Sequence, residues 1–326
     1  MAMAVYVNTN YSALQGQRYL GNVQNSLTTT YQRLSSGMRI NSAKDDAAGL
    51  QIADRLTSQI NGLNQGNRNA SDGIALAQTM EAGMDEISGM LQKMRTLTVQ
   101  AANGTNTSAD RDALAKEMSS LATEVNRIAM KTTFAGKTVL NGLTKDGSIY
   151  GVDNTGATDP GKAGKTGTMT LQVGSNKGDT ISFDVNSVMF STLSNNVADL
   201  MKEDDSTVFK TNKANGEVLV NFGKADFADS TKKTYIGNVI EMFDQMIASV
   251  DGQRANLGAI QNRLESSIRN QSNVAANEAD ARSRIRDADF AEESANLSQQ
   301  SIIQQAAASM LMQANTRPQL GLSLLG

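Results

Sequence analysis

A segment rich in glycine and lysine comes closest to a catalytic motif in this sequence. Residues 156–162 read Gly-Ala-Thr-Asp-Pro-Gly-Lys, which nearly matches a phosphate-binding loop, where backbone N–H groups and a lysine hold the phosphates. However, Ala163 stands where the motif requires Ser or Thr to bind magnesium, and Asp159 replaces the first glycine of the overlapping frame that ends at Thr166. We therefore expect a solvated loop, and an enzyme that uses this loop is the less favoured alternative.

Two kinds of charge cluster are candidates for further chemistry: adjacent carboxylates for glycoside hydrolysis and an arginine cluster for nucleic-acid binding. The spacing of the residues supports neither. Carboxylates act as a glycosidase pair only when both face one substrate, whereas neighbours in sequence point in different directions. The adjacent pairs are Asp45-Asp46, Asp204-Asp205 and Glu292-Glu293. The arginines at 282, 284 and 286 suggest a nucleic-acid contact, yet acidic residues interleave with them from Glu278 to Glu293. Mixed signs on one helix predict a solvated or intersubunit ion-pair face and no nucleic-acid partner.

Missing residue types exclude more. The 326-residue chain contains no His, Cys or Trp, and its net charge at pH 7 is -3. Without imidazole or thiol groups there is no Ser-His or Cys-His nucleophile, no zinc-thiolate site and no disulfide. We therefore expect no catalytic residue, no cofactor and no metal site.

The N-terminal segment and the apolar runs bear on where the protein goes. Residues 1–10 contain no basic residue and only a short apolar stretch, so they do not form a general secretory signal. No uninterrupted apolar run approaches the roughly 18 residues that a membrane span needs. We expect no membrane insertion, and if the protein leaves the cell, another route carries it.

The placement of aromatic residues divides the chain into two flanks and a middle. Aromatic residues are absent between Gln32 and Thr133, and only Phe290 follows Phe243. The middle, about residues 144–235, carries Tyr150, Phe183, Phe190, Phe209, Phe222, Phe227 and Tyr235. This change of composition predicts a domain boundary on each side of the middle.

The N-terminal flank carries a long seam with alternating spacings of three and four residues. Twelve of its fifteen positions are apolar, and such a repeat predicts a coiled-coil-like helix about 70 Å long. The positions are Ala53, Leu56, Ile60, Leu63, Asn67, Ala70, Ile74, Ala77, Glu81, Met84, Ile87, Leu91, Met94, Thr98 and Ala101. Ser42 with Asp45 predicts a capping box at its start, and Asn103-Gly104 marks its end. Its polar seam residues are expected to set register.

Glycines make this long helix weak by itself. It contains Gly62, Gly66, Gly73, Gly83 and Gly89, each of which costs roughly 1 kcal/mol relative to alanine in a helix interior. We therefore expect packing partners along much of its length.

Four further helices are predicted from the same kind of spacing. A helix that carries Leu20, Val23, Leu27 and Leu34 ends at Gly37. Thr107 with Asp110 opens an antiparallel partner for the long helix, with a seam of Leu114, Met118, Leu121, Val125 and Ile128. On the other flank Ile236, Ile240, Phe243, Ile247, Val250, Leu257 and Leu264 form a seam. The last helix carries Leu297, Ile303, Ala307, Met310 and Ala314 and is expected to stop before Pro318.

The middle reads differently from the flanks. Residues 168–173 and 179–185 are two β-runs joined by a Gly-bearing turn, and residues 217–222 are a third candidate. The predicted fold class is therefore mainly α, a long antiparallel coiled-coil or helical bundle made by both flanks, with a small α+β or β-rich inserted domain.

Several blocks in the flanks resemble bacterial flagellins. Residues 34–49, Leu-Ser-Ser-Gly-Met-Arg-Ile-Asn-Ser-Ala-Lys-Asp-Asp-Ala-Ala-Gly, look like the signature near the flagellin N-terminus. Residues 100–106 and 281–291 resemble two further blocks, as do Gln304-Gln-Ala and Leu322-Ser-Leu-Leu. The resemblance covers roughly the first 142 and the last 90 residues.

The resemblance implies a secreted structural protein that polymerises into the extracellular flagellar filament used for swimming. It also implies export through the flagellar type III pathway and terminal helices that are disordered before assembly. By resemblance, residues 1–41 and 281–326 form the inner core and residues 42–143 and 236–280 form the tube wall. Residues 144–235 then form the outward-facing variable domain.

The implied partners are other copies of the chain, an export chaperone that binds the C-terminal helices, and the filament cap and hook–filament junction proteins. The resemblance also implies recognition by Toll-like receptor five of the host through Gln92, Leu97 and Glu117. Lys93 stands where the receptor-activating pattern has Arg, so the planar fork of that side chain is lost. Leu322, Leu324 and Leu325 resemble the terminal leucines that the cytosolic flagellin inflammasome senses, and their first expected role is packing along the central channel.

Alternatives remain open at this point. A hook–filament junction protein shares the terminal helices, but the complete blocks at both ends favour a flagellin. An export-system effector or translocator would need an apolar hairpin that the sequence lacks. Met1-Ala2 is a candidate extension of the family's usual start, and O-linked glycans on Ser and Thr of residues 145–230 are a further hypothesis.

Overall fold

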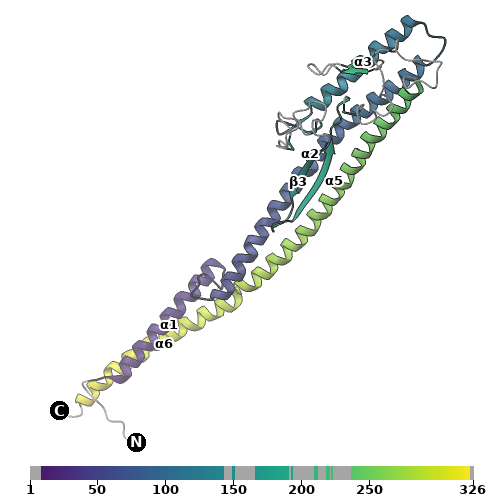
Figure 1. Cartoon of the computed structure of the whole chain (residues 1–326). Helices are drawn as coiled ribbons and strands as arrows, with labels where there is room; N and C mark the ends of the chain where they lie inside the picture. Colours follow the sequence, from purple (N-terminus) through teal and green to yellow (C-terminus); the bar gives the residue numbers. More distant parts are fainter. Residues whose placement is uncertain are drawn as a thin grey trace. The chain divides into compact units, whose positions relative to one another are not determined.

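The computed structural model of the chain (Figure 1) is mainly helical with short antiparallel strands, which confirms the predicted fold class. It describes residues 9–142, 149–150, 166–190, 192–193, 209–211, 218–220, 222 and 236–323, and for 166, 209–211 and 317–323 the backbone only. The helices are α1 Tyr11–Ser36, α2 Ala47–Ala101, α3 Ser108–Lys131, α5 Ile236–Arg286 and α6 Phe290–Ser323. None of the described helices is long and apolar enough to cross a membrane.

The strands within the described residues form three antiparallel pairs. They are β1 Thr133–Phe134 with β2 Lys137–Thr138, β3 Thr166–Gln172 with β4 Thr180–Asn186, and β5 Phe209–Thr211 with β6 Val218–Val220. The β3–β4 register places Met169 opposite Phe183, and the turn between these strands contains Gly178 in the left-handed region (φ 96°). The predicted pair of β-runs with a Gly-bearing turn is therefore confirmed.

The chain divides into two compact units, residues 1–61 with 273–326 and residues 62–272. The second unit holds the largest core, in which α2, α3 and α5 bury Leu, Ile and Met side chains. The α2 seam is confirmed here because Ala70, Met84 and Leu91 are fully buried. Leu76 and Met80 are equally buried, so α2 presents a broader face than one seam. A helix packed on two sides needs that wider apolar surface.

A row of polar side-chain contacts fixes the register of α2 against α5 in this unit. In each contact the two residue numbers add to 339, as expected for antiparallel helices. The contacts join Arg95 Nε to Asp244 Oδ1 (2.5 Å), Ser88 Oγ to Asp251 Oδ1 (3.3 Å), Asp85 Oδ1 to Arg254 Nη2 (2.8 Å) and Asn67 Nδ2 to Ser272 Oγ (3.3 Å). Asn67 was expected to set register, and its hydrogen bond to α5 is consistent with that role.

Two glycines of α2 allow residues 171–173 to pack closely against the helix. A Cβ placed on Gly66 would lie 2.1 Å from the Val173 carbonyl oxygen, and one on Gly73 would lie 2.3 Å from Leu171 Cδ1. Asn69 Nδ2 also donates to the Gln172 carbonyl at 2.9 Å. The end of β3 therefore approaches α2 at a distance that only glycine permits.

The predicted start of α2 was wrong by one helical turn, because the helix begins at Ala47 and not directly after Ser42. Asp45 Oδ2 accepts from the N–H groups of Asn41 (3.1 Å) and Ser42 (2.9 Å), which closes a separate turn before the helix. Asp46 is the residue that caps α2, because its Oδ1 accepts from the Gly49 N–H at 2.9 Å. The sequence pattern placed the cap at Ser42, whereas the structure places it at Asp46, four residues later.

The α3 helix begins as predicted and packs with a shifted seam. Thr107 and Asp110 form a full capping box. The fully buried seam residues are Met118 and Val125, whereas Leu114, Leu121 and Ile128 are only half-buried. The neighbouring alanines Ala115, Ala122 and Ala129 take the inner positions, because small side chains allow the closest approach of helices.

Side chains of α3 accept hydrogen bonds from the backbone of β6. Ser119 Oγ accepts from the Val220 N–H at 2.9 Å, and Thr123 Oγ1 accepts from the Val218 N–H at 3.3 Å. These bonds satisfy backbone donors on the edge of a strand that would otherwise need another strand or water.

The prediction that the last helix stops before Pro318 was wrong, because α6 continues to Ser323. Proline lacks the N–H that would bond the carbonyl four residues earlier, here that of Ala314. In the structure Asn10 Nδ2 donates to this carbonyl at 2.8 Å. The missing helical hydrogen bond is thus replaced from the other end of the chain.

Candidate assembly site

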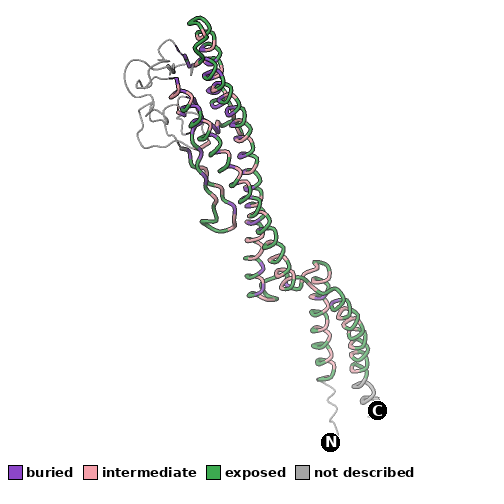
Figure 2. The backbone as a smooth tube through the Cα atoms, turned by 90° about the vertical axis from the view of Figure 1, so that its right-hand side faces the viewer, coloured by how far each residue is buried: buried purple, intermediate pink, exposed green. Residues whose placement is uncertain are grey.

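The helices α1 and α6 pair with each other while leaving most of their surface uncovered. Among the residues of α1 only Thr30 is buried. Figure 2 shows the two helices almost wholly in the colours of intermediate and exposed residues. The predicted seam residues of α1, Leu20, Val23, Leu27 and Leu34, are half-buried. Such a pair has little core of its own and depends on further contacts for stability.

The predicted seam of α6 was partly wrong. Ile303 and Met310 were expected to face inward, yet they are 42% and 67% exposed. Six residues turn a helix by about 240°, so Ile303 cannot share a face with Leu297. Instead Gln300 meets Thr30 (Oε1 to Oγ1 3.3 Å) and Leu311 lies against Gly16.

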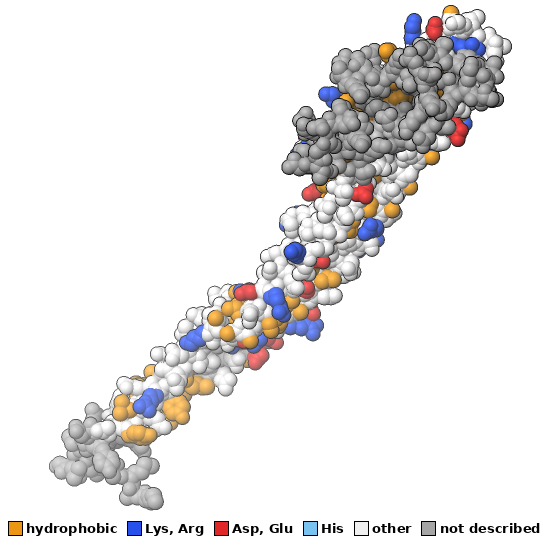
Figure 3. Space-filling model, in the orientation of Figure 1, with side chains coloured by type: hydrophobic (Ala, Val, Ile, Leu, Met, Phe, Trp, Pro, Cys, Tyr) orange, Lys and Arg blue, Asp and Glu red, His pale blue; other side chains and the backbone are white. Residues whose placement is uncertain are grey.

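Large apolar side chains consequently point away from the α1–α6 contact. Beyond Phe290 at the start of α6, they are Tyr11 (73% exposed), Leu14 (51%), Tyr19 (62%) and Tyr31 (53%) on α1 and Ile302 (67%), Ile303 (42%), Met310 (67%) and Met312 (65%) on α6. Orange hydrophobic side chains are visible over these helices in Figure 3. Exposed apolar surface of this extent marks a site for association. We call these eight residues the outer apolar set.

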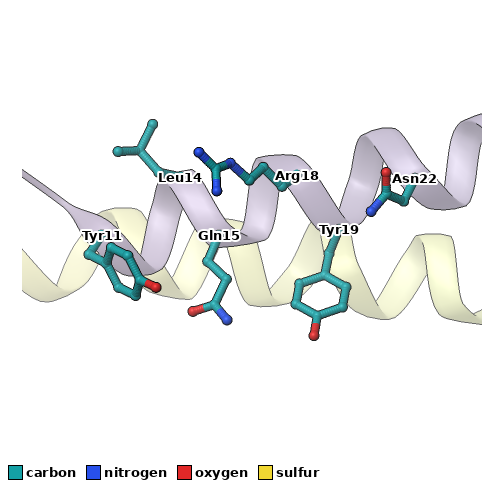
Figure 4. Close-up of a pocket in the computed structure, with 6 residues that line it drawn as sticks. All are labelled: Tyr11, Leu14, Gln15, Arg18, Tyr19 and Asn22. Carbon is teal, nitrogen blue, oxygen red and sulfur yellow. The ribbon is translucent and has the colours of Figure 1, made fainter.

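A shallow hollow on α1 lies within this surface. Its volume is about 300 Å³, and it is lined by Tyr11, Leu14, Gln15, Arg18, Tyr19 and Asn22. Figure 4 shows Tyr11, Gln15 and Tyr19 extending to one side of α1, while Leu14 and Arg18 extend to another. All six residues come from one helix, so a second surface is needed to enclose the hollow.

The ends of the terminal helices are joined by backbone hydrogen bonds over a long sequence separation. The Arg39 N–H donates to the Arg286 carbonyl (2.7 Å), and the Ala288 N–H donates to the Gly37 carbonyl (3.0 Å). Gly37 ends α1 in the left-handed conformation (φ 70°) that lets the chain turn here. Residues 34–49 and 281–291, which carry the flagellin resemblance, therefore lie against each other.

The acidic residues at the start of α6 have structural roles. Glu293 was expected on a solvated or intersubunit face, but its side chain is only 8% exposed and pairs with Arg33 of α1, Nη1 to Oε1 3.0 Å. Asp289 Oδ1 accepts from the Ala291 N–H at 2.8 Å. On the exposed part of the charged face, Arg284 Nη2 pairs with Asp280 Oδ2 at 2.9 Å.

The candidate receptor residues fall into two classes by exposure. Gln92 is exposed, and Lys93 Nζ pairs with Glu117 Oε1 at 2.8 Å on the surface of α2 and α3. Leu97 is buried between the helices at 7% exposure. Leu322 lies in α6 without a described side chain, and Leu324 and Leu325 lie outside the described residues.

The catalytic candidates gain no support from the described part of the chain. The loop 156–162 and the pair Asp204-Asp205 lie outside the described residues. Asp45 and Asp46 serve turns and caps, and the Ser42 and Asn41 N–H groups lower the pKa of Asp45. No group of three or more acidic side chains gathers within the described ranges as a metal site would require.

Comparison with known proteins assigns the family. Residues 7–145 match the bacterial flagellin N-terminal helical region, and residues 240–325 match the C-terminal helical region. Flagellin D of Vibrio anguillarum is 38% identical over 377 aligned residues, which cover 99% of this chain and 100% of that protein. The chain belongs to the bacterial flagellin family. Flagellin B of Vibrio cholerae is 37% identical with the same coverage.

Membership of the flagellin family gives the main function. The chain is a structural subunit of the extracellular flagellar filament, and the expectation that it is not an enzyme is confirmed because flagellins are structural proteins. The solved structure of a flagellar hook-associated protein from Vibrio parahaemolyticus is similar to this chain, with 16% identity and a TM-score of 0.50 over 74% of this chain and 100% of that one. At this identity the likeness shows a shared fold and nothing further. Full-length identity to flagellins therefore decides between the filament subunit and the junction-protein alternative.

Sequence reasoning missed two features of this flagellin. Tyr11, Ile302 and Met312 were not identified as surface residues, although their omission from every seam was a usable signal. Asn10 was missed because no local pattern links it to Ala314, which is 304 residues away.

Proposed function

We propose that this subunit is exported through the flagellar type III pathway and assembles through the outer apolar set of α1 and α6. The observation that carries the assembly proposal is the exposure of Ile302, Met310 and Met312 of α6 at 65–67%. Burying each such side chain against another copy is worth roughly 1.5 to 3 kcal/mol, so a few of them can drive polymerisation. Before assembly the same residues leave α1 and α6 weakly held, which supports their proposed disorder in transit.

The assembly proposal is tested with near-isosteric substitutions at Met310. Met310→Gln introduces a polar amide with similar volume and helix propensity, whereas Met310→Leu keeps the position apolar. We expect the Gln variant to raise the critical concentration for polymerisation about tenfold or more and the Leu variant to leave it nearly unchanged. Equal critical concentrations for the two variants would remove Met310 from the interface.

The export proposal has its own test. In cells that lack the flagellar export gate but retain general secretion, the chain should accumulate inside and be absent from the medium. Its appearance in the medium of those cells would contradict the proposed route. Co-purification of the cytosolic chain with a chaperone, abolished by deletion of residues 297–326, would support the proposed chaperone contact.

We propose further that the subunit is recognised by Toll-like receptor five through the exposed surface of α2 and α3. Gln92, Lys93 and Glu117 are accessible in the free chain, and the pair of Lys93 with Glu117 holds the two side chains together. Leu97 is buried, so its contribution would be to support the packing beneath this surface. Lys93→Arg should increase the response of a receptor reporter cell, because Arg restores the planar fork.

A control substitution separates receptor contact from stability. Gln100→Ala changes another exposed residue near the end of α2 and should leave both the response and the melting temperature unchanged. No response to the unmodified monomer at high concentration would remove the receptor hypothesis.

The remaining proposals concern the ends and the middle. The division into inner core (1–41, 281–326), wall (42–143, 236–280) and variable domain (144–235) is tested by labelling engineered cysteines in the assembled polymer. A cysteine at the exposed position 177 should react, and one at position 23 should be protected. Terminal Leu322, Leu324 and Leu325 are proposed for inflammasome sensing, which substitution of all three by Ala should abolish. The cap and junction proteins are proposed as the partners that contact the ends of the polymer.

A further inference from the structure

The side chain of Asn10 joins both terminal helices at once. Its Oδ1 accepts from the Ala13 N–H at 3.1 Å and thereby caps the start of α1. Its Nδ2 donates to the Ala314 carbonyl of α6 at 2.8 Å. The amide of Asn supplies an acceptor and a donor on two separate atoms, so one short side chain can make both bonds. Asp would lose the donor, and Ser would lose the reach.

The acceptor of this bond is unusual for a helix interior. Pro318 is the only proline in α6, and it has no N–H to donate to the carbonyl of Ala314 four residues earlier. Every other carbonyl of α6 before the last turn has a helical N–H available. The carbonyl of Ala314 is therefore the one interior carbonyl of α6 that has no helical N–H donor and can accept a hydrogen bond from outside the helix.

Away from the joint of residues 37–39 with 286–288, where Arg33 pairs with Glu293, the α1–α6 contact defines register weakly. Gly16 lies against Leu311, and the described side-chain hydrogen bonds between the two helices are Asn10 with Ala314, Thr30 with Gln300 and Arg33 with Glu293. The Thr30 bond is long at 3.3 Å. Small apolar residues repeat along both helices, so a slip by one turn exchanges similar contacts. A polar contact that exists in one register only would prevent such a slip.

We propose that Asn10 and Pro318 form a register lock, in which Pro318 exposes one carbonyl of α6 and Asn10 recognises it. The lock holds the two ends of the chain in one alignment, and it thereby fixes which members of the outer apolar set lie side by side on the helix pair. This inference does not depend on the export or receptor proposals. It assigns Asn10 as a positioning residue for the surface that other copies contact.

Disulfide trapping reads the register directly because the chain has no cysteine of its own. A Cβ on Gly16 would lie 3.8 Å from Leu311 Cβ, which is the usual separation in a disulfide. The pair Gly16→Cys with Leu311→Cys therefore reports the native register. The pairs Gly16→Cys with Ala307→Cys and Gly16→Cys with Asn315→Cys report slips of one turn in either direction. Oxidation rates are compared in the full-length chain, both as monomer and as polymer.

In the parent chain the native pair should oxidise faster than both slipped pairs. Asn10→Ser keeps a capping oxygen but cannot span the gap, so the preference for the native pair should fall about three- to tenfold, the value of one hydrogen bond. Asn10→Asp keeps the cap and lacks the donor, and it should act in the same direction.

Pro318→Ala supplies the decisive control, because the restored N–H bonds the Ala314 carbonyl within α6. In the Pro318→Ala background, Asn10→Ser should have no further effect on the oxidation ratio. An equal effect of Asn10→Ser in both backgrounds would overturn the lock, since Asn10 would then act only as a cap. An unchanged ratio in the parent background would overturn it as well.

Discussion

Arg33 of α1 and Glu293 of α6 form an ion pair whose Nη1–Oε1 distance is 3.0 Å, with the Glu293 side chain only 8% exposed. The pair lies near the joint where residues 37–39 bond to residues 286–288, at the opposite end of the α1–α6 contact from Asn10. Together the two contacts hold the terminal helices at both ends. Between them the contact is formed mainly by small and apolar side chains.

Removing one partner of this pair should destabilise the terminal helices. Arg33→Met leaves a nearly buried carboxylate without its counter-ion, and we expect a loss of about 2 kcal/mol in the stability of the α1–α6 pair. Hydrogen exchange of the α1 amides in the assembled polymer measures this loss. The double variant Arg33→Met with Glu293→Gln removes the stranded charge and should recover most of it. No recovery in the double variant would show that packing by the Arg33 stem, and not charge, is responsible.

Two glycines of α2 should respond oppositely to alanine. Gly66→Ala drives a Cβ into the Val173 carbonyl at 2.1 Å, so β3 must move, at a cost of about 1 to 3 kcal/mol. Gly89 has nothing within 4 Å of its Cβ position, and Gly89→Ala should stabilise the protein by about 0.5 to 1 kcal/mol. Denaturant unfolding of the full chain checks both values. A stabilising Gly66→Ala would contradict the close approach of β3 to α2.

Asp110 should make the start of α3 sensitive to acid. The Thr107 hydroxyl and the Thr107 N–H donate to Asp110 Oδ2 at 2.7 and 2.9 Å. These two hydrogen bonds hold the pKa of Asp110 below its ordinary value of 3.8. A lowered pKa means that the ionised group stabilises the folded state above pH 3.8 and that this contribution disappears as the pH falls through the folded pKa. Asp110→Asn should remove this part of the pH dependence below pH 3.8.

The measurement for Asp110 is the melting temperature of the parent chain minus that of Asp110→Asn between pH 2 and 6. The difference should be constant above about pH 5 and shrink in the acid range, because other carboxylates titrate equally in both proteins. A difference that stays constant down to pH 2 would contradict the role of the charge in the capping box.

Sequence periodicity predicted the long regular elements and failed where distant residues decide the structure. The α2 seam was correct because many positions share one spacing, so single polar residues such as Glu81 do not shift it. The α6 seam was partly wrong because Leu297 and Ile303 are six residues apart, and the predicted end of α6 was wrong because Pro318 was interpreted as a stop. Proline near a helix end removes one hydrogen bond, and Asn10 replaces it.

The assembly site was predictable only in part. The blocks that resemble flagellins identified the terminal segments, yet they did not show that residues 34–49 contact residues 281–291 through backbone groups. Backbone hydrogen bonds leave no side-chain pattern in the sequence. The role of Gly66 was hidden for a similar reason, since its partner is the carbonyl of Val173, the residue that follows β3. Exposure of Met310 and Ile302 follows only once the facing helix is known.

Electron microscopy of the purified chain after seeding or salting out tests most directly whether this flagellin forms filaments through its terminal helices. The full-length chain should form long helical filaments, and a chain that lacks residues 297–326 should stay monomeric under the same conditions because it has lost most of α6 and four members of the outer apolar set. Persistent monomers of the full-length chain, or filaments of the truncated chain, would contradict the account.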